Sequence, residues 1–64
     1  MKTTSEIDRQ AKNLMLMTRV QQDLFEDNMM FVVINEYEQA IATFPTFIEA
    51  YRYRLMYIIC KLEG

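Results

Sequence analysis

Histidine and tryptophan are absent from this sequence of 64 residues, and cysteine, glycine and proline occur once each. A single cysteine rules out a disulfide framework, and without histidine the common zinc sites lose their Cys/His ligand sets. The missing imidazole also removes the base that activates serine or cysteine nucleophiles. We therefore predict that the protein is not an enzyme, and expect no catalytic residue, metal site, cofactor or small-molecule substrate. We interpret Cys60 as a small, buried or half-buried packing residue.

Long apolar runs are missing as well. The longest covers residues 29–34, whereas a membrane-spanning helix needs about 20 apolar residues. Near the N-terminus Lys2 is followed by polar residues, where a signal peptide would have an apolar region. These features predict a soluble cytoplasmic protein that does not interact with membranes.

Positive charge is missing from the middle of the chain, because no Lys or Arg occurs between Arg19 and Arg52. The acidic residues of this stretch are Asp23, Glu26, Asp27, Glu36, Glu38 and Glu49. The flanking segments 1–19 and 50–64 are both net basic, while the whole chain has a net charge of −2, which argues against nucleic acid as a partner. The pattern fits an acidic segment packed between basic neighbours, in the same chain or in a second copy. A solvated face on which charges cluster by chance is the alternative.

Apolar residues at helical spacing lead us to predict an all-α fold, with residues 1–64 forming a single small domain of three antiparallel helices. The first 44 residues contain neither Gly nor Pro, which is typical of helical segments. We expect helices at about residues 5–26, 29–44 and 47–62. Whether the first two are separate or form one long helix stays open.

The segment 29–44 carries conflicting signals. Residues 31–34 are rich in β-branched side chains and favour a strand. A helical stripe runs through the same segment, consisting of Met30, Ile34, Tyr37, Ile41 and Phe44. We choose the helix, because a lone strand would have no partner elsewhere in the chain.

The clearest local signal lies just after Pro45. Thr46 and Glu49 have the spacing of a Ser/Thr-x-x-Glu capping box, which marks a helix start. Apolar residues at helical spacing follow, and we expect them to form the core: Ile48, Tyr51, Leu55, Ile58 and Leu62.

Part of this pattern is similar to a known repeat family. Val33, Tyr37, Ala40, Pro45 and Tyr51 stand at the relative positions of conserved types at the join between two tetratricopeptide repeats, and Asn28 falls where that family has its inter-helix turn. The stretch 28–51 therefore resembles a tetratricopeptide-like helical hairpin. The resemblance implies antiparallel helix pairs and peptide or protein binding without catalysis, with another chain completing the incomplete repeats.

The chain has six Met and eight Phe or Tyr residues, more than a core of this size can bury. Met and Tyr are common at binding surfaces. We predict a non-catalytic protein–protein interaction module, an adaptor or chaperone-like binder, whose partner is another protein or a second copy of itself. The predicted protein-binding residues lie off the main helical stripes: Tyr53, Met56, Tyr57, Met29, Phe31 and Val32.

Three alternatives stay open at this point. The first alternative is a small inhibitor from a virus or mobile element that occludes a host protein. The second is an enzyme subunit completed by its partner. The third alternative is a transcription regulator that contacts nucleic acid through basic residues, namely Arg9, Lys12, Arg19, Arg52 and Arg54. We interpret Asp23, Glu26 and Asp27 as solvated helix-end carboxylates, since they lack the spacing of a calcium loop.

Overall fold

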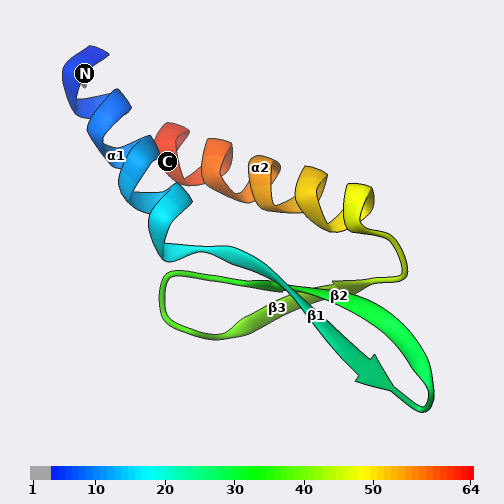
Figure 1. The fold of residues 1–64 in the computed structure, drawn as a ribbon. Coiled ribbons are helices and arrows are strands. Elements are labelled where there is room, and N and C mark those ends of the chain that lie inside the picture. The colour runs from blue at the N-terminus through cyan, green and yellow to red at the C-terminus, as the bar shows by residue number, and fades with distance from the viewer. Residues whose placement is uncertain (1–3) are drawn as a thin grey trace.

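The fold is a three-stranded antiparallel sheet with two helices, described by a computed structural model over residues 4–64 (Figure 1). The elements in chain order are α1 (Thr4–Met17), β1 (Arg19–Phe25), β2 (Asn28–Ile34), β3 (Ala40–Phe44) and α2 (Phe47–Glu63). The fold class is therefore mixed α/β, and the prediction of an all-α bundle with three helices is wrong.

The error lies in the first two predicted helices. The helix expected at residues 5–26 ends at Met17, where β1 follows after one residue, and the helix expected at 29–44 is replaced by β2 and β3. The β-branched run at 31–34 does have partners, because β1 and β3 pair with β2 on either side. Each supplies backbone hydrogen-bonding groups that the sequence pattern alone did not reveal.

The tetratricopeptide resemblance fails for the same reason. Val33 lies in a strand, Tyr37 in a turn and Ala40 at the start of the next strand, so these positions do not share a helix. Asn28 begins β2 instead of joining two helices. Spacing that matches a helical repeat has here been produced by strands and turns.

The third predicted helix is confirmed as α2. Thr46 is its N-cap, and its hydroxyl accepts a hydrogen bond from the backbone N–H of Glu49 at 3.3 Å. At the other end the backbone N–H of Gly64 donates to the carbonyl of Cys60 at 2.9 Å. These local caps satisfy backbone groups that a helix end leaves unpaired, which is why the sequence located this helix correctly.

The strands form a simple antiparallel meander in the order β1-β2-β3. The two-residue connection between β1 and β2 is Glu26-Asp27, and both residues have positive φ, 49° and 68°. This is the backbone of a type I′ hairpin turn, which usually contains Asn or Gly. The β2–β3 turn is organised by buried Asn35, whose side-chain oxygen accepts from the backbone N–H groups of Tyr37 and Gln39, each at 2.9 Å.

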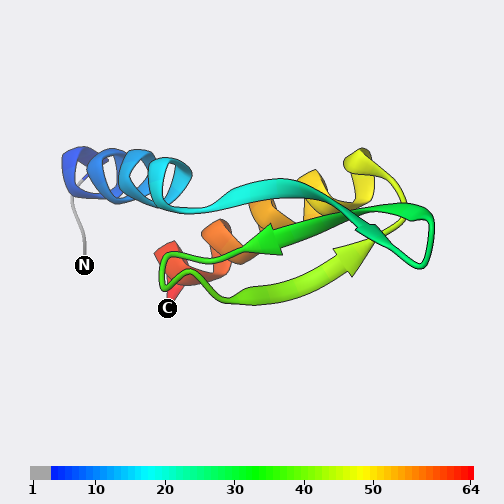
Figure 2. The ribbon, with the colours of Figure 1, turned by 60° about the horizontal axis from the view of Figure 1, so that its bottom comes forward.

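The core lies between α2 and one face of the sheet (Figures 1 and 2). Val33, near the end of the central strand β2, is fully buried, as is Ala50 of α2. The predicted core stripe of α2 is only partly correct, because Ile58 is 4% exposed but Ile48 is 63% exposed. The helix is rotated relative to our prediction, so that the small side chain of Ala50 allows close approach to the sheet.

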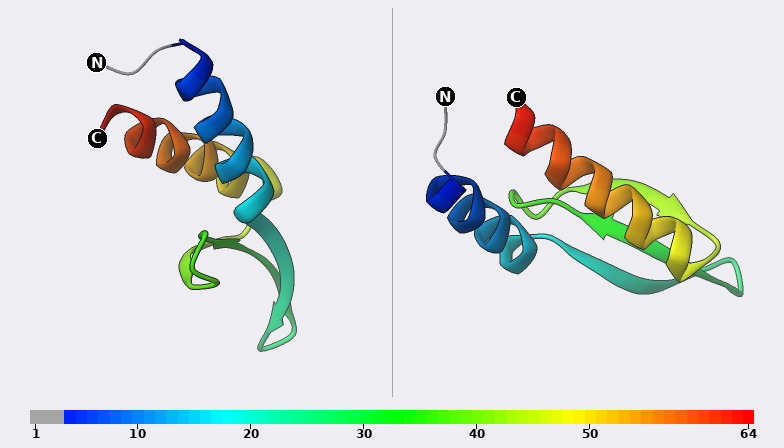
Figure 3. Two further views of the ribbon diagram at one scale, coloured as in Figure 1. Left: turned by 90° about the vertical axis from the view of Figure 1, so that its left-hand side faces the viewer. Right: turned by 90° about the horizontal axis from the view of Figure 1, so that it is seen from above.

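The first helix extends away from this core. Figure 3 shows α1 beside the C-terminal half of α2 rather than over the sheet, and none of its described residues is buried. The described chain is 46 Å long with a radius of gyration of 13.1 Å, whereas a compact domain of this length has about 11 Å. The elongated shape leaves apolar surface uncovered along much of the molecule.

One side chain of α2 holds α1 in place. The Nε of Arg54 donates to the hydroxyl of Thr18 at 2.9 Å, and its Nη2 donates to the carbonyls of Thr18, at 3.1 Å, and Met15. These carbonyls belong to the C-terminal end of α1, where a positive charge is favourable. The hydroxyl of Thr18 itself donates to the carbonyl of Leu14 at 2.6 Å.

Candidate protein-binding surface

The six residues predicted to bind protein do not lie on one surface. On β2, Met29 is exposed, Phe31 is half-buried, and Val32 is buried on the sheet face opposite α2. On α2, Met56 is on the outer side of the helix and exposed. The other two α2 residues make intramolecular contacts, since Tyr53 packs on Phe44 with ring centroids 5.5 Å apart and the hydroxyl of Tyr57 donates to Glu36.

A continuous apolar surface does exist at the end of the β1–β2 hairpin. Leu24 and Met29 are directly opposed across the two strands, and Phe31 follows Met29 on the same face. The ring of Phe31 contacts Phe47 edge to face at 5.9 Å, and Phe47 stacks on Tyr51 at 5.9 Å. We call the exposed members of this chain of contacts the hairpin surface: Leu24, Met29, Phe47 and Tyr51, which are 38–65% exposed.

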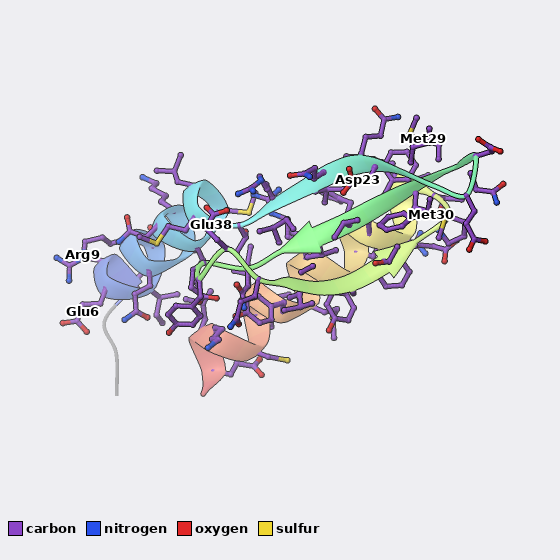
Figure 4. The ribbon with its side chains drawn as sticks, turned by 90° about the horizontal axis from the view of Figure 1, so that it is seen from below. Glu6, Arg9, Asp23, Met29, Met30 and Glu38 are labelled. Atoms are coloured by element: carbon purple, nitrogen blue, oxygen red, sulfur yellow. The ribbon has the colours of Figure 1, made fainter. Side chains whose placement is uncertain are left out.

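The hairpin surface is uncovered because the strands extend further than the helix above them. Figure 2 shows the end of the hairpin projecting beyond the first turn of α2, and Figure 4 shows Met29 at that end. The sequence identified Met29 and Phe31 but missed Leu24 and Phe47, and it wrongly assigned Tyr51 to the core. Leu24 and Met29 are equally far from Glu26-Asp27 in the sequence. This spacing would have predicted that they face each other, but only if Glu26-Asp27 had been recognised as a hairpin turn.

Four carboxylates lie at the hairpin end of the molecule. Glu26 and Asp27 form the turn itself, Asp23 lies on β1, and Glu49 is in the first turn of α2. Asp23, Glu26 and Asp27 are therefore on a strand and in its turn, not at the helix ends that we predicted, whereas Glu49 is at a helix start, as its capping box indicated. With no Lys or Arg between Arg19 and Arg52, this end of the molecule is negatively charged.

The opposite end of the sheet is fixed by polar contacts. The hydrogen bond to Glu36 and, to a lesser extent, burial raise the pKa of Tyr57 to about 12. Burial alone would raise the pKa of Glu36, but hydrogen bonds from Tyr57 and its own backbone, together with nearby Lys61, lower it. The Nζ of Lys61 lies 5.8 Å from the ring centroid of Tyr37 and 5.6 Å from that of Tyr57. A phenol that stays protonated beside an ionised carboxylate ties the β2–β3 turn to α2 and is unsuited to act as a base.

Two of the five basic residues considered for nucleic-acid contact are engaged within the chain. Arg54 binds the end of α1, and the guanidinium of Arg19 lies 2.7 Å from the carboxylate of Glu38. Arg9 is on α1, as Figure 4 shows, while Arg52 belongs to α2. The geometry therefore does not present these five side chains as one basic surface.

The described residues were also compared with the requirements of a metal site, a membrane-spanning helix and a buried cysteine. Within residues 4–64, no three His, Cys, Asp or Glu side chains gather in a way that would hold a metal ion. Neither helix in this part of the chain is long and apolar enough to cross a membrane. Cys60 is exposed, so our interpretation of it as a buried or half-buried packing residue is wrong.

Comparison with known proteins gives no match to a family model, to a curated protein or to a solved structure. The tetratricopeptide resemblance therefore has no support from family models, in agreement with the fold.

Proposed function

We propose that this protein is a non-catalytic protein-binding module that holds an apolar segment of a partner protein on its hairpin surface. The observation that carries the proposal is the contiguity of the exposed Leu24, Met29, Phe47 and Tyr51. Leu24 and Met29 are opposed across the strands, and half-buried Phe31, two residues further along β2 on the same face, contacts Phe47, which stacks on Tyr51. Aromatic residues and Met are enriched at the centres of protein interfaces, where they bury large areas at low cost in side-chain entropy.

The strands and the helix beneath the hairpin surface hold its side chains in position before a partner binds. Phe31 is paired with both β1 and β3, Met29 is paired with Leu24 of β1, and Phe47 starts a capped helix. A partner therefore meets side chains that are already held in position, so less conformational entropy is lost on association.

The carboxylates define the chemistry of the partner. Glu26, Asp27 and Glu49 lie next to the apolar centre, while Asp23 is on the other face of β1. A partner segment with basic residues flanking apolar ones complements this arrangement. Such charges mainly increase the association rate and the specificity. The proposed setting is the cytoplasm, where a reducing environment preserves an exposed, unpaired thiol such as Cys60.

The experiment compares two methionines of similar exposure, Met29 at 49% and Met56 at 59%. Met29→Asp places a charge in the hairpin surface, whereas Met56→Asp places the same charge on the outer side of α2. After circular dichroism shows both variants folded, affinity capture from native lysate should recover a protein with wild type and Met56→Asp that is lost with Met29→Asp. Equal capture by the two variants, or loss only with Met56→Asp, would contradict the proposal.

Salt dependence is the second readout of this experiment. Binding of the captured protein should weaken several-fold when the salt concentration rises from about 0.05 M to 0.5 M, because exposed charges are screened over a few ångströms at high salt. Affinity that is independent of salt would contradict the basic character that we assign to the partner.

A further inference from the structure

The two edges of the sheet differ in how well they are protected against pairing with another strand. β3 has five residues, its pairing with β2 contains a register shift at Val33/Ile34, and Pro45 follows it directly. Short length, irregularity and proline are the features that keep an edge strand from recruiting a partner.

β1 has none of these features. It has seven residues, pairs with β2 in continuous register, and contains neither Pro nor Lys. Within residues 4–64 nothing pairs with its outer side, and Figure 4 shows that edge free. A long, regular edge with unpaired backbone groups is a template for another strand.

The charges of β1 are complementary to those of a second β1 strand that runs antiparallel to it. The strand begins with the basic Arg19 and carries the acidic Asp23 four residues later, on the same face of the sheet. When two β1 strands pair about a two-fold axis beside Gln21, each Arg19 is directly opposite Asp23 of the second copy. Directly opposed residues of an antiparallel pair share a face, so this register keeps both copies of α2 on the same side. Arg19 also contacts Glu38, but a guanidinium with five N–H donors can serve two carboxylates.

The same arrangement covers apolar side chains that the single chain leaves in water. Leu16, at 85% exposure, and Met17 lie in the last turn of α1, immediately before β1. In this register they approach residues 24–27 of the second copy, where Leu24 and Phe25 are exposed. In this arrangement the protruding end of α1 contributes apolar contacts to the second copy.

We propose that the protein forms a homodimer in which the β1 strands of two copies pair antiparallel about a two-fold axis at Gln21, producing one continuous six-stranded sheet. The occupant of the β1 edge is a second copy of this chain, selected by the Arg19–Asp23 complementarity and the exposed end of α1. The contact uses β1 and α1 and shares Leu24 with the hairpin surface, but it does not require Met29 or Phe47, so Met29→Asp separates the two binding events.

The first test is a cross-link in a Cys60→Ser background. In the proposed register Gln21 is opposite itself, and directly opposed strand residues have the Cα separation that a disulfide needs. Gln21→Cys should therefore form a disulfide-linked dimer under mild oxidation at least ten times faster than Gln22→Cys, its neighbour on the same strand. A dimer in which Gln22→Cys cross-links as fast as Gln21→Cys would overturn the proposed pairing.

The second test reverses the charges and measures mass by sedimentation equilibrium. The wild type at about 0.1 mM should have twice the chain mass of 7.7 kDa. Arg19→Asp and Asp23→Arg should each raise the dimer Kd about tenfold or more, and the double variant Arg19→Asp/Asp23→Arg should return it to within about threefold of wild type. A monomeric wild type, or a double variant weaker than both single variants, would overturn the proposal. Met29→Asp should remain dimeric, which distinguishes this result from failure of the proposed function.

Discussion

The two ends of the sheet are built in opposite ways. At the end with the β2–β3 turn, polar groups are paired within the chain: Asn35 organises the turn, Tyr57 donates to Glu36, and Arg54 binds α1 nearby. At the hairpin end, the contacts are apolar and half exposed, and carboxylates line the rim. The polar contacts at the first end stabilise the fold, whereas the hairpin end leaves apolar side chains accessible to another molecule.

The largest effect is expected from the polar end. Arg54→Ala should lower the free energy of unfolding by about 2–4 kcal/mol, because a charged donor is removed from several acceptors at the C-terminus of α1. Arg52→Ala, on the same helix, should change it by less than about 0.5 kcal/mol, since Arg52 is exposed. Urea unfolding of both variants checks this, and a loss of equal size in the two would show that α1 is not held by Arg54.

The next largest effect concerns Tyr57. Tyr57→Phe should cost about 1–2 kcal/mol at neutral pH, because Glu36 loses a hydrogen-bond donor. Matched urea unfolding of the two proteins at pH 7 checks the magnitude.

The pH dependence of the same pair follows from the two pKa shifts. The pKa of Tyr57 is raised in the folded state from 10.0 to about 12, so its contribution is complete below pH 10 and is lost as the pH rises toward 12. The pKa of Glu36 is lowered, so its contribution is present above its ordinary value of 4.5 and is lost as the pH falls below it. The stability difference between wild type and Tyr57→Phe should therefore be greatest between about pH 5 and 10. A difference that is constant from pH 3 to 12 would contradict the assigned hydrogen bond.

A smaller effect, of opposite sign, is expected at the hairpin end. Glu26 and Asp27 both have positive φ, which costs side chains other than Gly and Asn roughly 1 kcal/mol. Replacing the pair by Asn-Gly should therefore stabilise the protein by about 1 kcal/mol in urea unfolding. Asp23→Asn removes a nearby charge without altering the turn and serves as the control, and equal stabilisation by the control would assign the effect to charge instead of backbone strain.

The smallest effect concerns the single cysteine. Because Cys60 is exposed, Cys60→Ala should change stability by less than about 0.5 kcal/mol and leave partner capture intact. Loss of partner capture after mild thiol modification of the folded wild type, but not of Cys60→Ala, would contradict this view.

The part of the fold that the sequence predicted is the part fixed by local interactions. Pro45, the Thr46–Glu49 capping box and Gly64 define α2 within a few residues of its ends. The start of α1 at Thr4 lies one residue from that of the helix expected at residues 5–26. Its end was missed, because α1 stops at Met17 without Gly or Pro and is held there by Arg54, which is 36 residues beyond Thr18 in the sequence.

The hairpin could not be predicted from local signals. Glu26-Asp27 is an unusual composition for a type I′ turn, and without that turn the segments on either side read as helices. The strand character of residues 31–34 was visible, but it was decided by pairing with β1 and β3. Met29 and Phe31 were therefore selected as surface residues on a helix that does not exist, and Leu24 and Phe47 were missed because they join them only across the folded sheet.

The methionines allow the central claim to be tested directly, because those in the described chain lie on different surfaces. Met29 is on the hairpin surface, Met56 on the outer side of α2, Met30 on the sheet face opposite α2, and Met15 and Met17 on α1. With methyl-¹³C-methionine, adding the partner isolated by affinity capture should shift the Met29 resonance strongly and leave that of Met56 unchanged. A partner that shifts Met56 and leaves Met29 in place would contradict the assignment of the hairpin surface as the binding site.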